Sequence, residues 1–186
     1  MKRTVLPTVL FLLLTACSGA TGIKETACDQ LFWDGTVGTC LPKGWHVVDR
    51  GGLDERGAPP EVLVAFQADN PVSGQFPTVT VTREVLTQKL TSSAYSDASV
   101  HSVEKLPEYQ HVESKEVSID GETLQMHTFT AQPRSDQPKA RFFQVSMALN
   151  DIGYTFTGAV PLSVESAIEN QIKLMLTNAT LKEQVQ

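Results

Sequence analysis

The sequence lacks the common signatures of catalysis and metal binding. A serine hydrolase would show Gly-x-Ser-x-Gly, a zinc protease His-Glu-x-x-His, and a phosphate-binding loop Gly-x-x-x-x-Gly-Lys. None of these patterns occurs in the 186 residues. Their absence argues against an enzyme of those classes and makes a non-catalytic protein the better hypothesis.

Basic residues are also scarce. The chain has 15 Lys and Arg against 21 Asp and Glu, which gives a net charge of −6. This balance argues against nucleic acid or an anionic membrane surface as the partner. Because acidic and basic residues are interspersed instead of forming blocks, the charge is interpreted as a solvated surface.

Long apolar runs are absent as well, apart from one near the N-terminus. Met1-Lys2-Arg3 precedes an apolar run from Val5 to Leu14, which is too short to span a bilayer and is typical of an export signal. The following residues, Leu14-Thr15-Ala16-Cys17, resemble the lipobox of bacterial lipoproteins. That resemblance implies cleavage after residue 16 and a lipid anchor on Cys17, at the outer side of a membrane in the cell envelope. An ordinary signal peptide cut nearby is the alternative.

The chain has only three cysteines, of which lipid would occupy Cys17. Cys28 and Cys40 then form an even pair in an oxidising compartment, which predicts a disulfide bond. A metal or redox pair would need a Cys-x-x-Cys spacing or nearby histidines, and the intervening segment contains neither. Residues 17–27 are small and polar and predict a tether, and residues 28–40 predict a hairpin with a two-residue turn at Asp34-Gly35 that acts as a lid or staple.

The remaining segment, residues 41–181, is long enough for one domain with its own core. Period-two alternation and β-branched composition predict about seven strands. Asp120-Gly121 and Asn150 to Gly153 supply hairpin turns, so the sheet is predicted to be mostly antiparallel. The strands are Trp45–Asp49, Val62–Ala68, Thr78–Leu86, Gln110–Ile119, Glu122–Thr130, Arg141–Leu149 and Tyr154–Val160.

Two helices are predicted to flank this sheet. Apolar residues from Val164 to Ala179 recur at three and four residues and predict an amphipathic helix with Ser163 as its N-cap. A weaker pattern from Ser92 to Lys105 predicts a second helix that Pro107 ends. The predicted fold class is therefore α+β.

The order of these parts resembles the PsbP-like and DcrB-like group, and within it the actinobacterial LpqN-type lipoproteins. The resemblance depends on Leu41-Pro42-Lys43-Gly44-Trp45, on Phe76-Pro77-Thr78-Val79, on Leu106-Pro107-Glu108-Tyr109, on Tyr154-Thr155-Phe156-Thr157 and on the final helix. Each motif is short, so the match lies in their arrangement. The resemblance implies a central antiparallel sheet flanked by helices, used as a binding or accessory module without a catalytic centre or cofactor.

No metal site is predicted from the four histidines. If Asp120-Gly121 is a two-residue turn, regular pairing places His111 and His127 on opposite faces of the hairpin, where they cannot share a metal unless a bulge intervenes. His46 and His101 lie elsewhere. Strand aromatics are assigned to the core, namely Trp45, Phe142, Phe143, Tyr154 and Phe156.

Three loops are long for hairpin connections: Arg50–Pro60, Asn70–Gln75 and Gln132–Lys139. They are either binding loops or tolerated insertions. Antiparallel connectivity allows only one of the first two to join Gln132–Lys139 in a single patch. The leading hypothesis is a lipid-anchored binding or accessory protein that recognises an envelope protein or component, and the alternatives are a carrier of a small apolar ligand and a hydrolase with an unrecognised site. The predicted partner-binding residues are Arg50, Asp54, Arg56, Arg134, Asp136 and Lys139.

Overall fold

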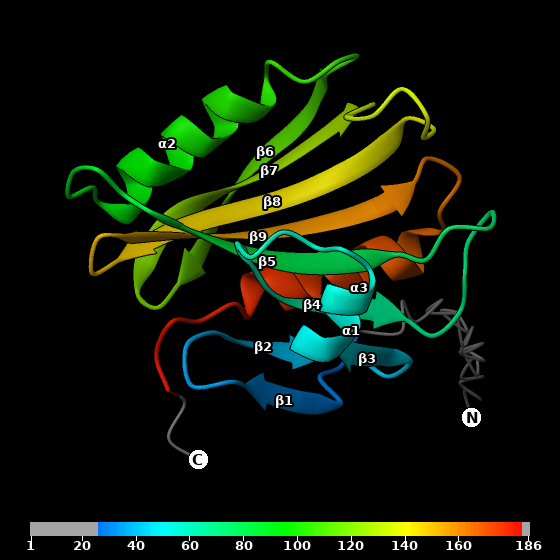
Figure 1. The fold of residues 1–186 in the computed structure, drawn as a ribbon, viewed down its shortest axis with the longest axis horizontal. Helices are drawn as coiled ribbons and strands as arrows, with labels where there is room; N and C mark the ends of the chain where they lie inside the picture. The colour runs from blue at the N-terminus through cyan, green and yellow to red at the C-terminus, as the bar shows by residue number, and fades with distance from the viewer. Residues whose placement is uncertain (1–25, 184–186) are drawn as a thin grey trace, which may run out of the picture.

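A seven-stranded antiparallel sheet forms the body of the molecule in a computed structural model that describes residues 26–183 (Figure 1). The strand order is β3-β4-β5-β9-β8-β7-β6. The strands are β3 (Trp45–Val48), β4 (Val62–Ala68), β5 (Thr78–Val85), β6 (Gln110–Ile119), β7 (Glu122–Ala131), β8 (Ala140–Leu149) and β9 (Ile152–Pro161). This α+β architecture and its antiparallel pairing are as the sequence predicts.

One face of the sheet is apolar and is covered by helix α3 (Ser166–Thr177). Alternation sends Val79, Val81 and Phe156 to this face, where Ile172 of α3 is fully buried against them in the main core. Close approach of the helix requires Gly158 in β9, because a Cβ there would stand 2.3 Å from Cγ2 of Ile172. The helix begins later than predicted: its N-cap is Glu165, without a side-chain cap.

The opposite face is only partly covered. Helix α2 (Ser92–Val103) lies across β7 and β8, and the short helix α1 (Arg50–Glu55) packs on β3 and β4 through Leu53. Helix α1 was not predicted from the sequence. It forms in a segment with two glycines because Asp49 caps it by accepting a hydrogen bond from the amide of Gly52 at 2.9 Å.

A separate two-stranded hairpin, β1 (Gln30–Trp33) and β2 (Gly38–Leu41), packs against α3 and against β4, where the ring centroids of Phe32 and Phe66 lie 5.0 Å apart (Figure 1). Cys28 and Cys40 are disulfide-bonded, with their Cα atoms 5.5 Å apart. Val37 is fully buried in the main core, and Thr39 donates a hydrogen bond to the carbonyl of Met175 at 2.6 Å. The hairpin therefore contacts both α3 and the sheet and belongs to the main core.

Two of the three predicted hairpin turns have two residues, and the third is longer than predicted. Ile119 pairs with Glu122 and Leu149 with Ile152, so Asp120-Gly121 and Asn150-Asp151 are two-residue turns in which all four residues have positive φ. In the N-terminal hairpin Trp33 pairs with Gly38, so its loop has four residues instead of two. The longer loop forms because the Asp34 carboxylate accepts hydrogen bonds from the amides of Thr36 and Val37, both at 2.8 Å.

The prediction that His111 and His127 lie on opposite faces is wrong. The β6–β7 register shifts between His111 and Glu113, which leaves Val112 as a bulge and pairs His111 with Phe129. One extra residue in β6 moves the strand residues before it, including His111, to the other face of the sheet. The two imidazole rings therefore stack, with centroids 5.3 Å apart.

Candidate binding surfaces

The loops form a recess at one end of the sheet, which we call the loop-end recess. It lies where β7 passes into β8, β4 into β5, and β9 ends, and its cavity volume is about 460 Å³. Most of its lining is proline, aromatic or alanine: Gln75, Phe76, Thr78, Pro133, Gln137, Pro138, Ala140, Phe142, Ala159, Val160 and Pro161. Asn70–Gln75 is thus the loop that joins Gln132–Lys139, and Arg50–Pro60 belongs to the other end.

Backbone and side-chain hydrogen bonds fix the shape of these loops. Val72 and Gln75 exchange amide–carbonyl bonds at 2.7 and 2.9 Å around a tight turn. The Ser73 hydroxyl lies 2.8 Å from that of Ser163, so the residue predicted as a helix cap instead ties two loops together. These hydrogen bonds therefore preform the recess in the folded chain.

The exposed apolar side chains of this end include Phe76 and Leu162, which are 45% and 46% exposed. Phe142, assigned to the core from the sequence, is only half-buried and lines the recess. The other four strand aromatics are buried as predicted. Phe142 departs from them because it lies on the sheet face away from α3, paired with Phe129.

The six predicted partner-binding residues fall into two groups. Arg134 and Asp136 pair with each other at 2.8 Å at the tip of the Gln132–Lys139 loop, and Lys139 lies 4.0 Å from Glu108. The Arg134 guanidinium holds the pKa of the Asp136 carboxyl below its usual range, chiefly through their hydrogen bond.

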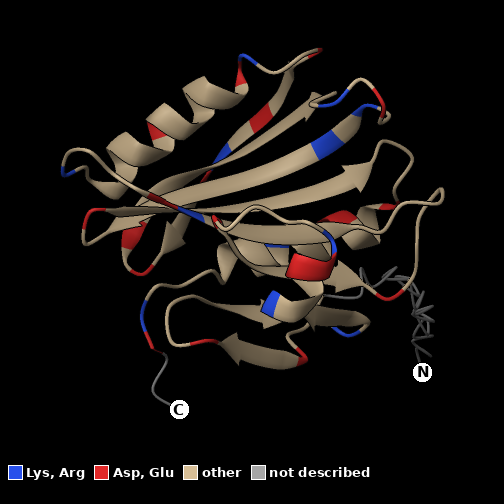
Figure 2. Ribbon diagram, viewed as in Figure 1, with Lys and Arg blue, Asp and Glu red and all other residues tan. Residues whose placement is uncertain are grey.

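The second group lies on or beside α1. Arg50 pairs with Asp54 and donates to the carbonyl of Val62, while Arg56 donates to the Gln67 side chain at 2.7 Å. These contacts hold α1 on β4. The first group lies beyond the end of β7 and Arg50 lies at the beginning of β4, whereas Arg56 reaches Gln67 near the end of β4. Figure 2 shows the charged residues interspersed along the ribbon.

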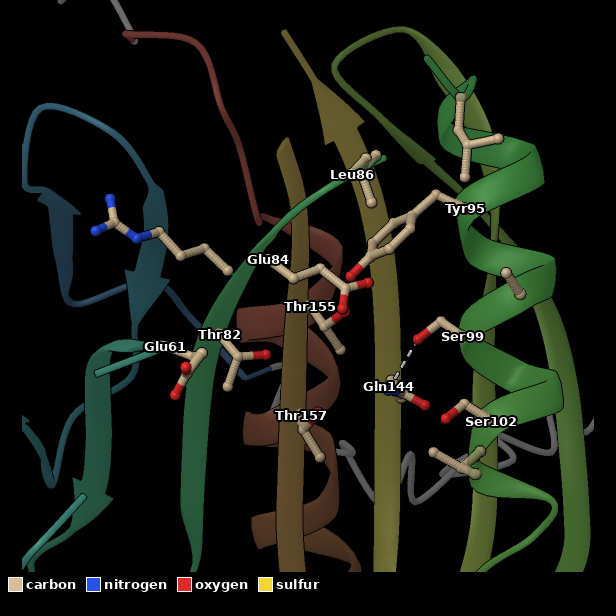
Figure 3. Close-up of a pocket in the computed structure, with 14 residues that line it drawn as sticks. Glu61, Thr82, Glu84, Leu86, Tyr95, Ser99, Ser102, Gln144, Thr155 and Thr157 are labelled. Carbon is tan, nitrogen blue, oxygen red and sulfur yellow. Dashed lines mark hydrogen bonds between the residues drawn. The ribbon is translucent and has the colours of Figure 1, made fainter. Parts of the chain in front are cut away.

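A second recess, which we call the helix-side recess, lies between α2 and the sheet face that α3 leaves open (Figure 3). Its cavity volume is about 390 Å³. The floor is polar, because alternation sends Thr82 of β5, Thr155 and Thr157 of β9 and Gln144 of β8 to this face. Sequence reasoning missed this recess, although the alternating threonines of β5 already predicted one wet face.

Hydroxyl groups connect the floor of this recess to α2. Ser99 accepts hydrogen bonds from Gln144 at 3.2 Å and Ser146 at 2.8 Å, and the Ser146 hydroxyl lies 3.0 Å from that of Thr155. Tyr95 lies 3.2 Å from Thr155, and burial raises the pKa of its phenol to about 12. The Ser-rich composition that weakens α2 as a helix therefore supplies its contacts to the sheet.

In addition to the two recesses, a cluster of histidine, tyrosine and serine side chains surrounds the buried His127. Its Nε2 lies 3.0 Å from the Tyr109 hydroxyl and its Nδ1 3.2 Å from the Ser114 hydroxyl, which is also 3.1 Å from Nε2 of His111. Burial, followed by the neighbouring His111, lowers the pKa of His127. Within residues 26–183 no group of three or more His, Cys, Asp or Glu side chains is placed to hold a metal ion.

Comparison with known proteins shows similarity at the level of the fold. No family model and no curated protein matches the sequence. The fold is similar to LpqN of Mycobacterium tuberculosis, described as involved in cell envelope biogenesis, with a TM-score of 0.54 and 8% identity over 81% of this chain and 88% of that one. Cyanobacterial PsbP from Synechocystis sp. PCC 6803 matches with a TM-score of 0.49 and 12% identity over 88% of this chain and 96% of that one.

The predicted signal peptide (1–16), the predicted lipidation site Cys17 and most of the predicted tether (17–27) lie outside the described residues. Among residues 26–183 no helix is long and apolar enough to cross a membrane. Attachment to a membrane through Cys17 is therefore a prediction of the sequence.

Proposed function

We propose that this chain is a lipid-anchored extracytoplasmic accessory protein that recognises another envelope protein through its loop-end recess and carries out no chemistry. The lipobox-like residues before Cys17 support the anchor. The similarity to LpqN supports an envelope role, because that protein is described as involved in cell envelope biogenesis.

The observation that most supports binding is the composition of the loop-end recess. Three prolines, Phe76 and Phe142 surround about 460 Å³ of space at one end of a rigid sheet. Apolar side chains left exposed on a folded domain favour association, because covering them removes apolar area from water at roughly 25 cal/mol per Å². Proline also loses little conformational entropy when it is covered.

A protein segment fits this recess better than a small apolar ligand. The recess is open to solvent: Phe76 is 45% exposed, and Gln75, Gln137 and Thr78 place polar groups among its apolar ones. A carrier of an apolar ligand would instead enclose most of its cargo. Mixed polar and apolar lining suits the backbone and side chains of a partner loop.

The proposal is tested by crosslinking in the native host and recovery of the bound partner. Phe76→Ser replaces the exposed aromatic ring of the recess with a small polar side chain and should abolish recovery. Val85→Ser is the matched control, because Val85 is 84% exposed at the opposite end of β5 and should leave recovery unchanged.

Both substitutions are on the surface and should change the free energy of unfolding by no more than about 0.5 kcal/mol. Equal recovery from the two variants would remove the loop-end recess as the docking surface. Native mass spectrometry of the same material checks the carrier alternative, since a bound lipid would add its mass to the chain.

A further inference from the structure

We propose that the helix-side recess is a second binding site, and that it takes an aliphatic amine in its protonated form. It differs in place and chemistry from the loop-end recess: its floor is a row of hydroxyl and amide groups on β5, β9 and β8. Figure 3 shows Gln144 and Thr157 reaching from the strands into the space that α2 roofs with Ser99 and Ser102.

The first observation is a buried acceptor without a donor. Gln144 is 7% exposed, its amide nitrogen donates to Ser99, and its amide oxygen has no hydrogen-bond partner within the described chain. An unpaired buried carbonyl is costly, typically as much as a lost hydrogen bond. Because this oxygen has almost no accessible surface, an N–H group of a ligand in the recess would supply the missing donor once the Gln144 amide turns toward it.

The second observation is the sign of the charge around the recess. Glu84 and Glu61 both line it, and the single basic residue among its described lining is Arg83. Arg83 pairs with Tyr154, so its side chain belongs to the face covered by α3, whereas Thr82 and Glu84 on either side of it belong to the recess. The carboxylates therefore face the recess without a neutralising cation, which favours a positively charged ligand.

The third observation is an apolar wall opposite the polar floor. Leu86 and Leu90 from the connection before α2, with Ala98 and Val103 of α2, complete the lining. A methylene chain packs on such a wall while its ammonium groups reach carboxylates and the amide oxygen. Carboxylates from two different segments, Glu61 before β4 and Glu84 in β5, suit a ligand with an amine at each end.

Tyr95 contributes a neutral hydroxyl group. Its ring covers Gly153, where a Cβ would stand 2.3 Å from the ring, and burial keeps the phenol protonated. The hydroxyl is thus tied to Thr155 and adds no third negative charge. The net attraction for a cation comes from the two glutamates.

The test is titration calorimetry of the folded chain from residue 18 onward with 1,5-diaminopentane, at low ionic strength where exposed carboxylates act most strongly. We expect a Kd below about 1 mM. The uncharged probe 1,5-pentanediol has the same length and should bind at least about tenfold more weakly, because it lacks charge-assisted hydrogen bonds.

Two matched variants locate the site. Glu84→Gln should weaken diamine binding about tenfold, and Glu116→Gln, an exposed glutamate on the edge strand β6, should leave it within about twofold. Gln144→Leu should also weaken it, with a thermal melt to confirm folding. Equal binding of diamine and diol, equal effects of the two glutamate variants, or no binding of the diamine would each overturn the proposal. Partner recovery by Glu84→Gln should be normal, so this result is independent of the loop-end recess.

Discussion

Replacement of Gly158 by alanine is expected to destabilise the fold by forcing α3 away from the sheet. The added Cβ would stand 2.3 Å from Cγ2 of Ile172 and 3.5 Å from its Cβ. Ile172 is fully buried, and a β-branched side chain in a helix has essentially one rotamer, so it cannot turn away. The helix itself must shift, which costs about 1–3 kcal/mol for an overpacked core.

The double variant Gly158→Ala/Ile172→Ala tests the cause of that loss. Ile172→Ala alone should cost about 2–5 kcal/mol by leaving a cavity. In the double variant the new methyl group occupies part of that cavity, so the combined loss should be smaller than the sum by about 0.5–3 kcal/mol. Gly51→Ala is the control, because the nearest atom to its added Cβ is 3.5 Å away in an exposed helix.

Urea unfolding followed by circular dichroism measures all four variants against the wild type. Additive losses within about 0.5 kcal/mol would show that Gly158 and Ile172 do not contact each other. That result would contradict the placement of α3 on β9, and with it the description of the main core.

Three further predictions concern the anchor, the disulfide and the buried histidine. Cys17→Ala should release the protein from membranes, measured by detergent partitioning and intact mass, whereas a soluble wild-type chain with another N-terminus would refute lipidation. In the chain from residue 18 onward, thiol labelling of the unfolded, unreduced protein should modify neither Cys28 nor Cys40, and reduction should cost about 3 kcal/mol. Because the pKa of His127 is lowered on folding, the unfolded chain takes up a proton below about pH 6.5 that the folded chain does not, so stability should fall as pH decreases from there. His127→Gln should flatten this dependence in urea melts between pH 7.5 and 5, and an unchanged slope would exclude His127 as its source.

Local patterns in the sequence were enough to predict the sheet. Gln110–Ile119 and Val62–Ala68 have the predicted bounds, four other strands differ by one residue at one end, and β9 begins two residues earlier and ends one residue later than predicted. Period-two alternation and turn residues such as Asp120-Gly121 act within a few residues, so they are visible without the fold. Helix α1 was missed because its cap, Asp49, stabilises only six residues that contain two glycines.

Features that depend on contacts between distant segments could not be predicted. The bulge at Val112 brings His111 and His127 together, and nothing in the local sequence of β6 marks it. Connectivity predicted that only one of Arg50–Pro60 and Asn70–Gln75 could join Gln132–Lys139, and the structure places Asn70–Gln75 there. The helix-side recess could not be predicted, because it depends on the position of α2, which is set by the contacts of that helix to Ser146 and Thr155.

Site-specific photocrosslinking from the loop-end recess is the most direct test of the proposed function. A photoreactive amino acid at Gln137, on the recess wall, should capture one envelope protein in the native host, while the same group at Glu116 on β6 should not. Cys17→Ala should abolish the capture by removing the chain from the membrane. Capture of the same protein from Glu116 and not from Gln137 would contradict recognition through the loop end.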